Sequence, residues 1–154
     1  MIEKILTKII TEEFKKIILK NNIRFNLYRR LKHWNFDINK QKDGYNIKFE
    51  NEKYYLYKID MGMGRAYDFK EAKDKEELVY LIIYRITLTI AESKLMYCGS
   101  RLKVFEFQEE LLKSVNDKWW ESAREYHKKI NNFENNDRTF HQFSSRNIKN
   151  ILLR

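Results

Sequence analysis

The chain has 154 residues, of which 43% are hydrophobic and 34% are charged, which suits one domain with its own core and excludes a globally disordered chain. Its single cysteine, Cys98, excludes an internal disulfide and a cysteine-based zinc site, and favours a reducing compartment. The formal net charge of +9 divides into +6 over residues 1–60, −1 over residues 61–137 and +4 over residues 138–154. Basic ends of this kind indicate either a surface for an acidic partner or the codon bias of an AT-rich genome.

The first predicted element is an amphipathic helix over residues 2–21. Its apolar residues recur at helical spacing: Ile2, Ile5, Leu6, Ile9, Ile10, Phe14, Ile17 and Ile18. Asn21 and Asn22 are the predicted end, because asparagine tolerates the left-handed conformation of a helix cap. Residues 22–43 are compatible with a second short helix or with an ordered connection.

From Tyr45 the hydrophobic period changes from helical spacing to two. Three runs alternate in this way, and they are separated by turns at residues 51–52 and 61–64. The pattern predicts a three-stranded antiparallel meander over residues 45–70. Helices must cover one face of the meander, because three strands alone are marginally stable.

Asp74 and Glu77 form a capping-box pattern at the start of the next predicted helix. This helix is apolar on most sides, which predicts a buried, central position, and Gly99 is its predicted end. Arg85 and Thr89 form a polar seam in it. Because a buried charge must be paired, Arg85 is expected to form an ion pair with a neighbouring strand or helix.

Two further helices complete the predicted helical part, residues 74–131. Apolar stripes define them, and Asn116 with Asp117 separates them and can cap the second. Residues 132–154 are predicted to be a basic C-terminal tail. The expected architecture is a single α+β domain over residues 1–154, with an N-terminal helix and a three-stranded antiparallel meander packed against a helical C-terminal half.

No catalytic constellation is recognisable. His33, His127 and His141 are far apart in sequence and are expected at the surface. Adjacent carboxylates such as Glu109 and Glu110 diverge by about 100° on a helix, so they predict solvated faces rather than an acid–base pair. The sequence therefore predicts a binding protein rather than an enzyme, with no catalytic residue, metal or cofactor.

Short motifs in the helical half follow one another in a characteristic order. They are Asp74-Lys75-Glu76-Glu77-Leu78-Val79-Tyr80, Ile86-Thr87-Leu88-Thr89-Ile90-Ala91, Arg101 with Phe105-Glu106-Phe107-Gln108-Glu109-Glu110-Leu111-Leu112, and Asn116-Asp117-Lys118-Trp119. In order and spacing they resemble the immunity protein 63 family of bacterial polymorphic toxin systems, over about 60 residues. The chain departs from the family pattern at Arg101-Leu102, where the family has an arginine pair, and that puts a role of such a pair in doubt.

The resemblance implies a bacterial, cytoplasmic protein that binds a cognate toxin domain and blocks its active site or an essential motion. No chemistry is required of such a protein. The expected contact residues are Arg65, Asp68, Arg101 and Trp120. Trp120 is included because it lies about 100° from the inward stripe that contains Trp119, and a Trp is well suited to an interface.

A basic nucleic-acid-binding module is the alternative interpretation. It would use basic residues near the N-terminus, namely Lys15, Lys16, Lys20, Arg24, Arg29, Arg30 and Lys32. The arginines of the tail would add to them. Tyr54, Tyr55 and Tyr57 could stack on bases, but the motif of an RNA-recognition fold is missing. No membrane partner is expected, because no signal-peptide pattern or membrane-spanning run is present.

Overall fold

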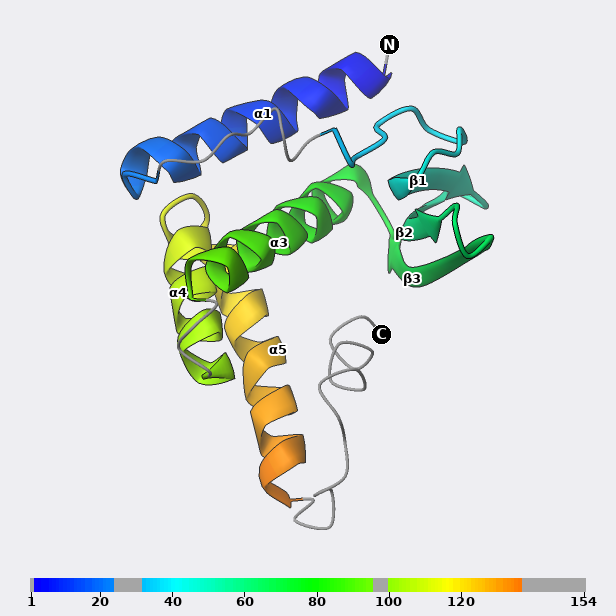
Figure 1. Ribbon diagram of the computed structural model, residues 1–154. Helices are drawn as coiled ribbons and strands as arrows, with labels where there is room; N and C mark the ends of the chain where they lie inside the picture. Colours follow the sequence, from blue (N-terminus) through cyan, green and yellow to red (C-terminus); the bar gives the residue numbers. More distant parts are fainter. Residues whose placement is uncertain (1, 24–31, 96–99, 137–154) are drawn as a thin grey trace.

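A computed structural model describes residues 2–23, 32–95 and 100–136 of the chain (Figure 1). The helices are α1 (Ile2–Lys20), α3 (Lys75–Lys94), α4 (Arg101–Lys113) and α5 (Asp117–Asn136). The strands are β1 (Gly44–Glu50), β2 (Lys53–Asp60) and β3 (Arg65–Ala72). The strands are antiparallel neighbours in the order β1-β2-β3. The predicted α+β class and the predicted meander are both confirmed.

Helix α3 lies at the centre of the molecule, with α1 on one side, the sheet at its N-terminal end and the α4–α5 hairpin on the remaining side (Figure 1). Ile10, Phe14 and Ile17 of α1 are fully buried in the core that α1 and α3 share. Burial of each such side chain contributes about 2 kcal/mol. Helix α3 occupies the predicted central position because it is apolar on most of its sides.

Hydrogen bonds fix the helix ends largely as the sequence predicts. Asn22, with φ 48°, follows the end of α1 in the left-handed region. The Asp74 carboxylate accepts a hydrogen bond from the Glu77 amide at 2.8 Å, and caps α3. Asn116 accepts from the amide of Trp119, which caps α5.

Two predicted helix ends are wrong. Helix α3 ends at Lys94, with Leu95 as its cap, and not at Gly99, which lies outside the described residues. Helix α5 continues to Asn136, five residues into the predicted tail, because its asparagine-rich last turn contains no glycine or proline that would stop it. The rest of the predicted tail, residues 137–154, lies outside the described residues.

The sheet packs one face on α3, and Leu56 and Ile47 from that face are buried. Pairing is interrupted between Leu56 and Lys58, where Asp68 and Phe69 of β3 both stand opposite Tyr57. This is a β-bulge, and Asp68 has a φ of 59° in it. The bulge changes the alternation of side chains along β3, and so directs the carboxylate of Asp68 towards α3.

The outer edge of β1 is covered by the connection that precedes it. Trp34 forms a parallel bridge to Tyr45, and the rings of the two residues stack at 4.3 Å. The Tyr45 amide donates to the His33 carbonyl oxygen at 2.8 Å. Buried Asn46 accepts a hydrogen bond from Asn35. The described part of residues 22–43 is thus an ordered connection, one of the two predicted alternatives.

None of the helices in the described part of the chain combines the length and the apolar character that crossing a membrane requires.

Gly44 is predicted to be essential for this covered edge. It has φ 101°, and a Cβ at this position would collide with the His33 carbonyl oxygen. Gly44→Ala should lower the free energy of unfolding by about 3 kcal/mol, because strain and overpacking add. Urea denaturation measures the change. Gly64→Ala is the matched control, because Gly64 has φ 61° and open space around it; it should cost about 1 kcal/mol. Equal losses in the two variants would contradict this assignment.

Candidate partner-binding cavity

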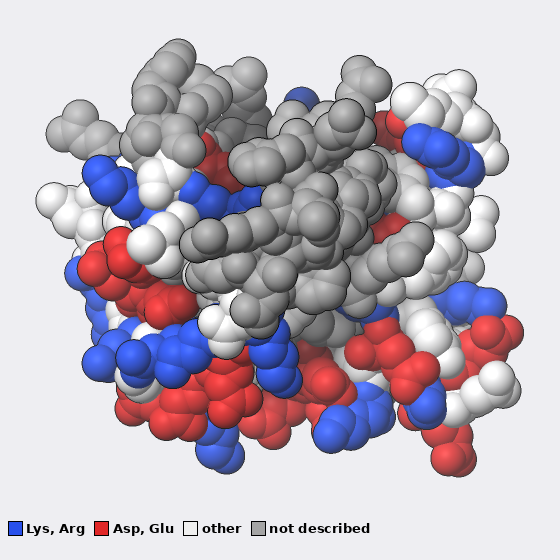
Figure 2. Space-filling view, turned by 90° about the horizontal axis from the view of Figure 1, so that it is seen from below, with Lys and Arg blue, Asp and Glu red and all other residues white. Residues whose placement is uncertain are grey.

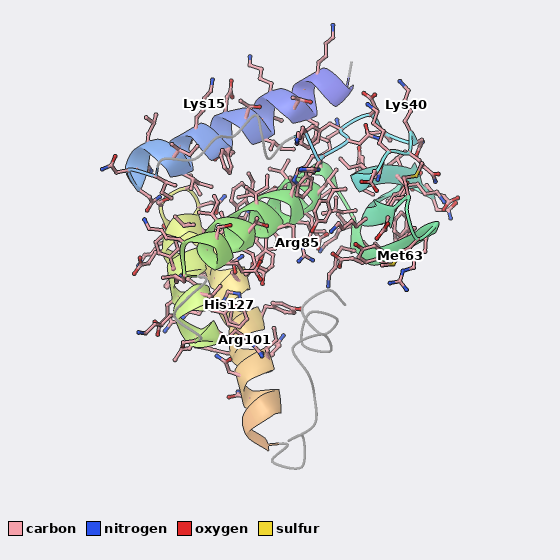
Figure 3. All side chains as sticks on the ribbon, viewed as in Figure 1. Lys15, Lys40, Met63, Arg85, Arg101 and His127 are labelled. Atoms are coloured by element: carbon pink, nitrogen blue, oxygen red, sulfur yellow. The ribbon has the colours of Figure 1, made fainter. Side chains whose placement is uncertain are left out.

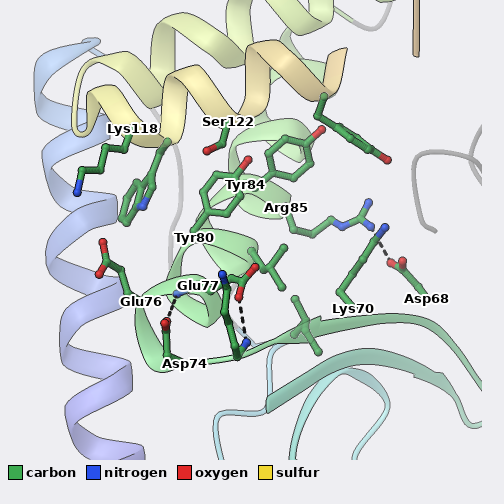
Figure 4. Close-up of a pocket in the computed structure, with 15 residues that line it drawn as sticks. Asp68, Lys70, Asp74, Glu76, Glu77, Tyr80, Tyr84, Arg85, Lys118 and Ser122 are labelled. Carbon is green, nitrogen blue, oxygen red and sulfur yellow. Dashed lines mark hydrogen bonds and ion pairs between the residues drawn. The ribbon is translucent and has the colours of Figure 1, made fainter. Parts of the chain in front are cut away.

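A cavity of about 520 Å³ opens between strand β3, helix α3 and helix α5 (Figure 4). That volume is within the range of ligand and side-chain pockets. Its lining residues are Leu56, Asp68, Lys70, Lys73, Asp74, Glu76, Glu77, Tyr80, Leu81, Tyr84, Arg85, Lys118, Trp119, Ser122 and Tyr126. Aromatic rings and charged groups dominate the lining, which makes the cavity the strongest candidate site in the described part of the chain.

An ion pair between Asp68 and Arg85 joins the sheet to helix α3 at one end of the cavity. The Arg85 guanidinium donates to Asp68 Oδ2 at 2.7 Å, and the two side chains are only 11% and 3% exposed. The prediction that Arg85 pairs with a strand or helix neighbour is confirmed. Burial raises the pKa of Asp68, and the charge of Arg85 only partly offsets this effect. Asp68 Oδ1 is buried without a hydrogen-bond partner among the described residues, which is one source of the desolvation.

Lys70 lies beside this ion pair, and its amino group extends towards Arg85 and Asp68 (Figure 4). Burial lowers the pKa of Lys70, and the charge of Arg85 lowers it further, while Asp68 raises it. Two cations of the cavity lining therefore share one carboxylate, on which Lys58 of the neighbouring cavity also acts. The local surplus of one positive charge is poorly solvated.

At the other end, the rim of the cavity has charged groups of both signs. Asp74 and Glu77 are engaged at the N-terminus of α3, where their carboxylates accept backbone hydrogen bonds from Glu77 and Lys73. Lys118 and Glu76 face each other across the rim and are exposed (Figure 4). This end has no strong surplus of either sign, and the exposed charges of Lys118 and Glu76 can meet a partner.

Behind the cavity, Tyr84, His127 and Glu109 form a buried hydrogen-bonded chain. His127 Nδ1 lies 2.7 Å from Glu109 Oε1, and Tyr84 Oη lies 3.1 Å from His127 Nε2. A carboxylate can only accept, so Nδ1 holds the proton and Nε2 accepts from the Tyr84 hydroxyl. Phe105 stacks on the imidazole at 3.9 Å. The prediction of a surface or edge position for His127 is wrong, because the α4–α5 hairpin encloses its side chain; Glu109 beside it is partly buried rather than fully solvated.

Tyr84, His127 and Glu109 follow one another in the order of a nucleophile, a base and an orienting carboxylate. However, the tyrosine keeps its hydroxyl proton and the imidazole stays neutral. Burial raises the pKa of Tyr84 above its ordinary value and lowers the pKa of His127, although Glu109 opposes the latter change. A tyrosine that holds its proton so firmly beside a weakened base is a poor nucleophile. The arrangement instead joins α3, α4 and α5 through one satisfied polar network.

The four predicted contact residues do not form one cluster. Asp68 lines the cavity, and Arg65 lies three residues away on β3, where it is exposed and its guanidinium lies 5.8 Å from the centre of the Tyr67 ring. Arg101 begins α4 and lies well away from Arg85 (Figure 3). Trp120 is partly buried, and Lys113, at the other end of α4, lies 4.4 Å from its ring centre. Their role in contacts stays a prediction.

Sequence reasoning did not identify Lys70, Tyr80, Ser122 or the His127 chain as parts of one site. The only available signal was Arg85, which is charged within an apolar helix and so required a partner. The bulge that supplies Asp68 has no glycine to mark it, because Asp68 itself takes the left-handed conformation.

A second cavity, of about 470 Å³, lies towards the β1 edge and is lined in part by Lys58, Tyr45 and Tyr67. Lys58 lies 5.6 Å and 5.7 Å from the centres of the two tyrosine rings, so its charge has favourable neighbours. The described residues contain no group of three or more metal-ligating side chains. Acidic and basic side chains both occur on the described part of the face seen in Figure 2.

No protein-family model, no curated protein and no solved structure matches this chain.

A double-mutant cycle should measure how much the ion pair between Asp68 of the sheet and Arg85 of α3 stabilises the protein. Asp68→Asn, Arg85→Met and the double variant should show a favourable coupling energy of about 2 kcal/mol, because the pair is buried and hydrogen-bonded. Urea denaturation at pH 7 provides the four free energies of unfolding. Additive effects within about 0.5 kcal/mol would show that the two side chains do not interact.

His127 is predicted to make the protein less stable in mild acid. Its pKa is lowered in the folded state, so below the ordinary histidine pKa of 6.5 the unfolded chain binds a proton that the folded chain does not. The contribution of neutral His127 to the free energy of unfolding is fully present above that pH and is lost as the pH falls. Between pH 7.5 and 5.5 wild type should lose about 1 kcal/mol more than His127→Gln. Urea midpoints measure the difference. The control, exposed His33→Gln, should behave as wild type, and an identical loss in His127→Gln would contradict the assignment.

Proposed function

We propose that this chain is an immunity protein, which binds a cognate toxin domain and neutralises it by steric occlusion. The observation that carries the proposal is the position of the motifs that resemble the immunity protein 63 family. Asp74, Glu76, Glu77 and Tyr80 come from the first motif, and Lys118 and Trp119 come from the last. These segments are about 40 residues apart in sequence, yet they meet at the same cavity.

The lining of the cavity has the composition of a binding hot spot. Tyrosine, tryptophan and arginine are the residues that most often dominate binding energy at interfaces. Tyr80 and Trp119 lie with their ring centres 6.3 Å apart, and Tyr80 and Tyr84 lie 5.9 Å apart. These rings are anchored by helix packing, so a partner would meet a surface that is already ordered.

Occlusion needs only a rigid surface and complementary contacts. A toxin segment that enters the cavity would be held between the aromatic wall of α3 and the charged groups of β3 and α5. The chain would then act stoichiometrically, by covering the toxin's active site or by preventing its motion. No catalytic group is required, which accords with the raised pKa of Tyr84 and the lowered pKa of His127.

The nucleic-acid alternative depends on basic residues near both ends of the chain. The chain has 31 Lys and Arg and 22 Asp and Glu, and the described ranges contain 24 and 21 of these; Arg24, Arg29 and Arg30 lie outside them. Of the basic residues assigned to nucleic-acid binding, Lys16 is hydrogen-bonded to Glu13 and Lys20 to the Ser114 carbonyl oxygen. These two contacts leave fewer free cations on α1 for phosphates, which favours a protein partner.

Growth rescue and co-purification test the proposal together. The protein encoded beside this chain should arrest bacterial growth when it is expressed alone, and co-expression of this chain should restore growth. The two proteins should also co-purify at a one-to-one ratio in about 0.5 M salt, where phosphate-driven binding is largely suppressed. Nucleic acid that binds at low salt, together with no rescue, would favour the basic-module interpretation instead.

Blocking the cavity is predicted to abolish this protection. Ser122 is exposed and lines the cavity from α5, so Ser122→Trp should fill its mouth and weaken toxin binding at least about tenfold. Glu121→Trp adds the same bulk at an exposed position outside the lining, and should bind as wild type. Calorimetry measures affinity, and circular dichroism verifies that both variants fold. Wild-type affinity in Ser122→Trp would place the interface elsewhere, without contradicting the rescue result.

A further inference from the structure

We infer that the cavity contains a carboxylate-binding subsite, in which Lys70 and Arg85 hold a carboxylate attached to an apolar or aromatic body. The source of the carboxylate is an acidic group of the protein partner or a free carboxylic acid. Binding of an acidic group of the partner rests on the proposed function and specifies which feature of the toxin the cavity recognises. Binding of a free carboxylic acid does not depend on the proposed function.

The uneven pairing of charges supplies the first argument. Among the described residues, Asp68 is the only close counter-charge of Arg85 and Lys70, and Arg85 already donates to it. Lys53, by contrast, lies 2.6 Å from Glu71, and Lys48 lies 2.6 Å from Glu50. Lys70 therefore differs from these sheet lysines, because its half-buried ammonium faces a cavity and not a carboxylate of its own. An incoming anion would relieve that desolvation.

The walls of the cavity determine what the anion is attached to. Tyr80, Tyr84 and Trp119 form an aromatic surface along the helical side, and Leu56 lies on the strand side. A ligand with a planar or aliphatic body would bury its apolar surface against these residues while its charged end reaches Lys70 and Arg85. A small inorganic anion would leave most of the volume empty.

The size of the charge surplus favours a carboxylate over a phosphate. Of the groups that line this end of the cavity, the two cations Lys70 and Arg85 and the carboxylate of Asp68 leave a single positive charge, which matches one negative charge on the ligand. A phosphate monoester has nearly two negative charges at neutral pH, and Asp68 would repel the second. The planar guanidinium of Arg85 is also suited to the two oxygens of a carboxylate.

Titration with benzoate tests the subsite directly. Benzoate has one carboxylate on an aromatic ring, and benzamide is its neutral counterpart of the same shape. Calorimetry at constant ionic strength should detect saturable benzoate binding with a dissociation constant of about 1–10 mM. Benzamide should bind at least about tenfold more weakly, because it brings no charge to the two cations.

Lys70→Met is the decisive variant. Methionine retains the half-buried aliphatic stem and removes the charge, so the fold should persist, as the thermal midpoint will show. Benzoate affinity should fall at least about tenfold. Lys53→Met is the matched control on the same sheet and should bind benzoate as wild type. Equal binding of benzoate and benzamide, unchanged affinity in Lys70→Met, or no saturable binding up to about 50 mM would each overturn the inference.

Competition separates the two sources. If benzoate displaces the captured toxin, and Lys70→Met weakens toxin binding, the partner supplies the carboxylate. If benzoate binds while the toxin pair is unaffected or no rescue is found, the subsite stands and serves a free carboxylic acid. Failure of the proposed function and failure of the subsite therefore give different results.

Discussion

Helix α3 has buried side chains on nearly all of its sides, and this constraint determines where every other element can lie. Ten of its residues are buried, and Arg85 is the only charged residue among positions 78–91. A helix of this kind cannot face water along any complete stripe, so it must be enclosed. Helix α1, the sheet and the α4–α5 hairpin each cover part of it (Figure 1). Polar and aromatic side chains line this enclosure at the cavity, and also at the second cavity, which Ile86 and Thr89 of α3 border.

Arg85 is the exception on which the cavity depends. A guanidinium in an apolar helix needs a counter-charge, and the described elements supply one only from β3. The bulge at Asp68 and Phe69 makes this possible, because it directs Asp68 to the helical side while Phe69 remains 56% exposed on the other. The same local distortion leaves Lys70 on the helical side, beside the pair. The fold and the candidate site thus share a single cause.

Periodicity was sufficient to predict the elements, because their patterns are strong and depend on nearby residues. The three alternating runs within residues 45–70 predicted strands, and the apolar pattern of residues 78–91 predicted a central helix. Pairings between distant residues could not be predicted in this way. His127 and Glu109 each looked like surface residues on their own helices, and only the packing of α4 against α5 encloses them. Asp68 could be proposed as important, but its partner depends on a bulge that no glycine marks.

The two edges of the sheet differ, and the difference affects how the molecule can associate. The edge at β1 is covered by the bridge between Trp34 and Tyr45. The edge at β3 has no strand partner in the described ranges, but its bulge interrupts the regular row of amides and carbonyls. An interrupted, twisted edge is a poor template for another strand. Self-association into extended sheets is therefore disfavoured at both edges, and a binding partner must recognise side chains rather than extend the sheet.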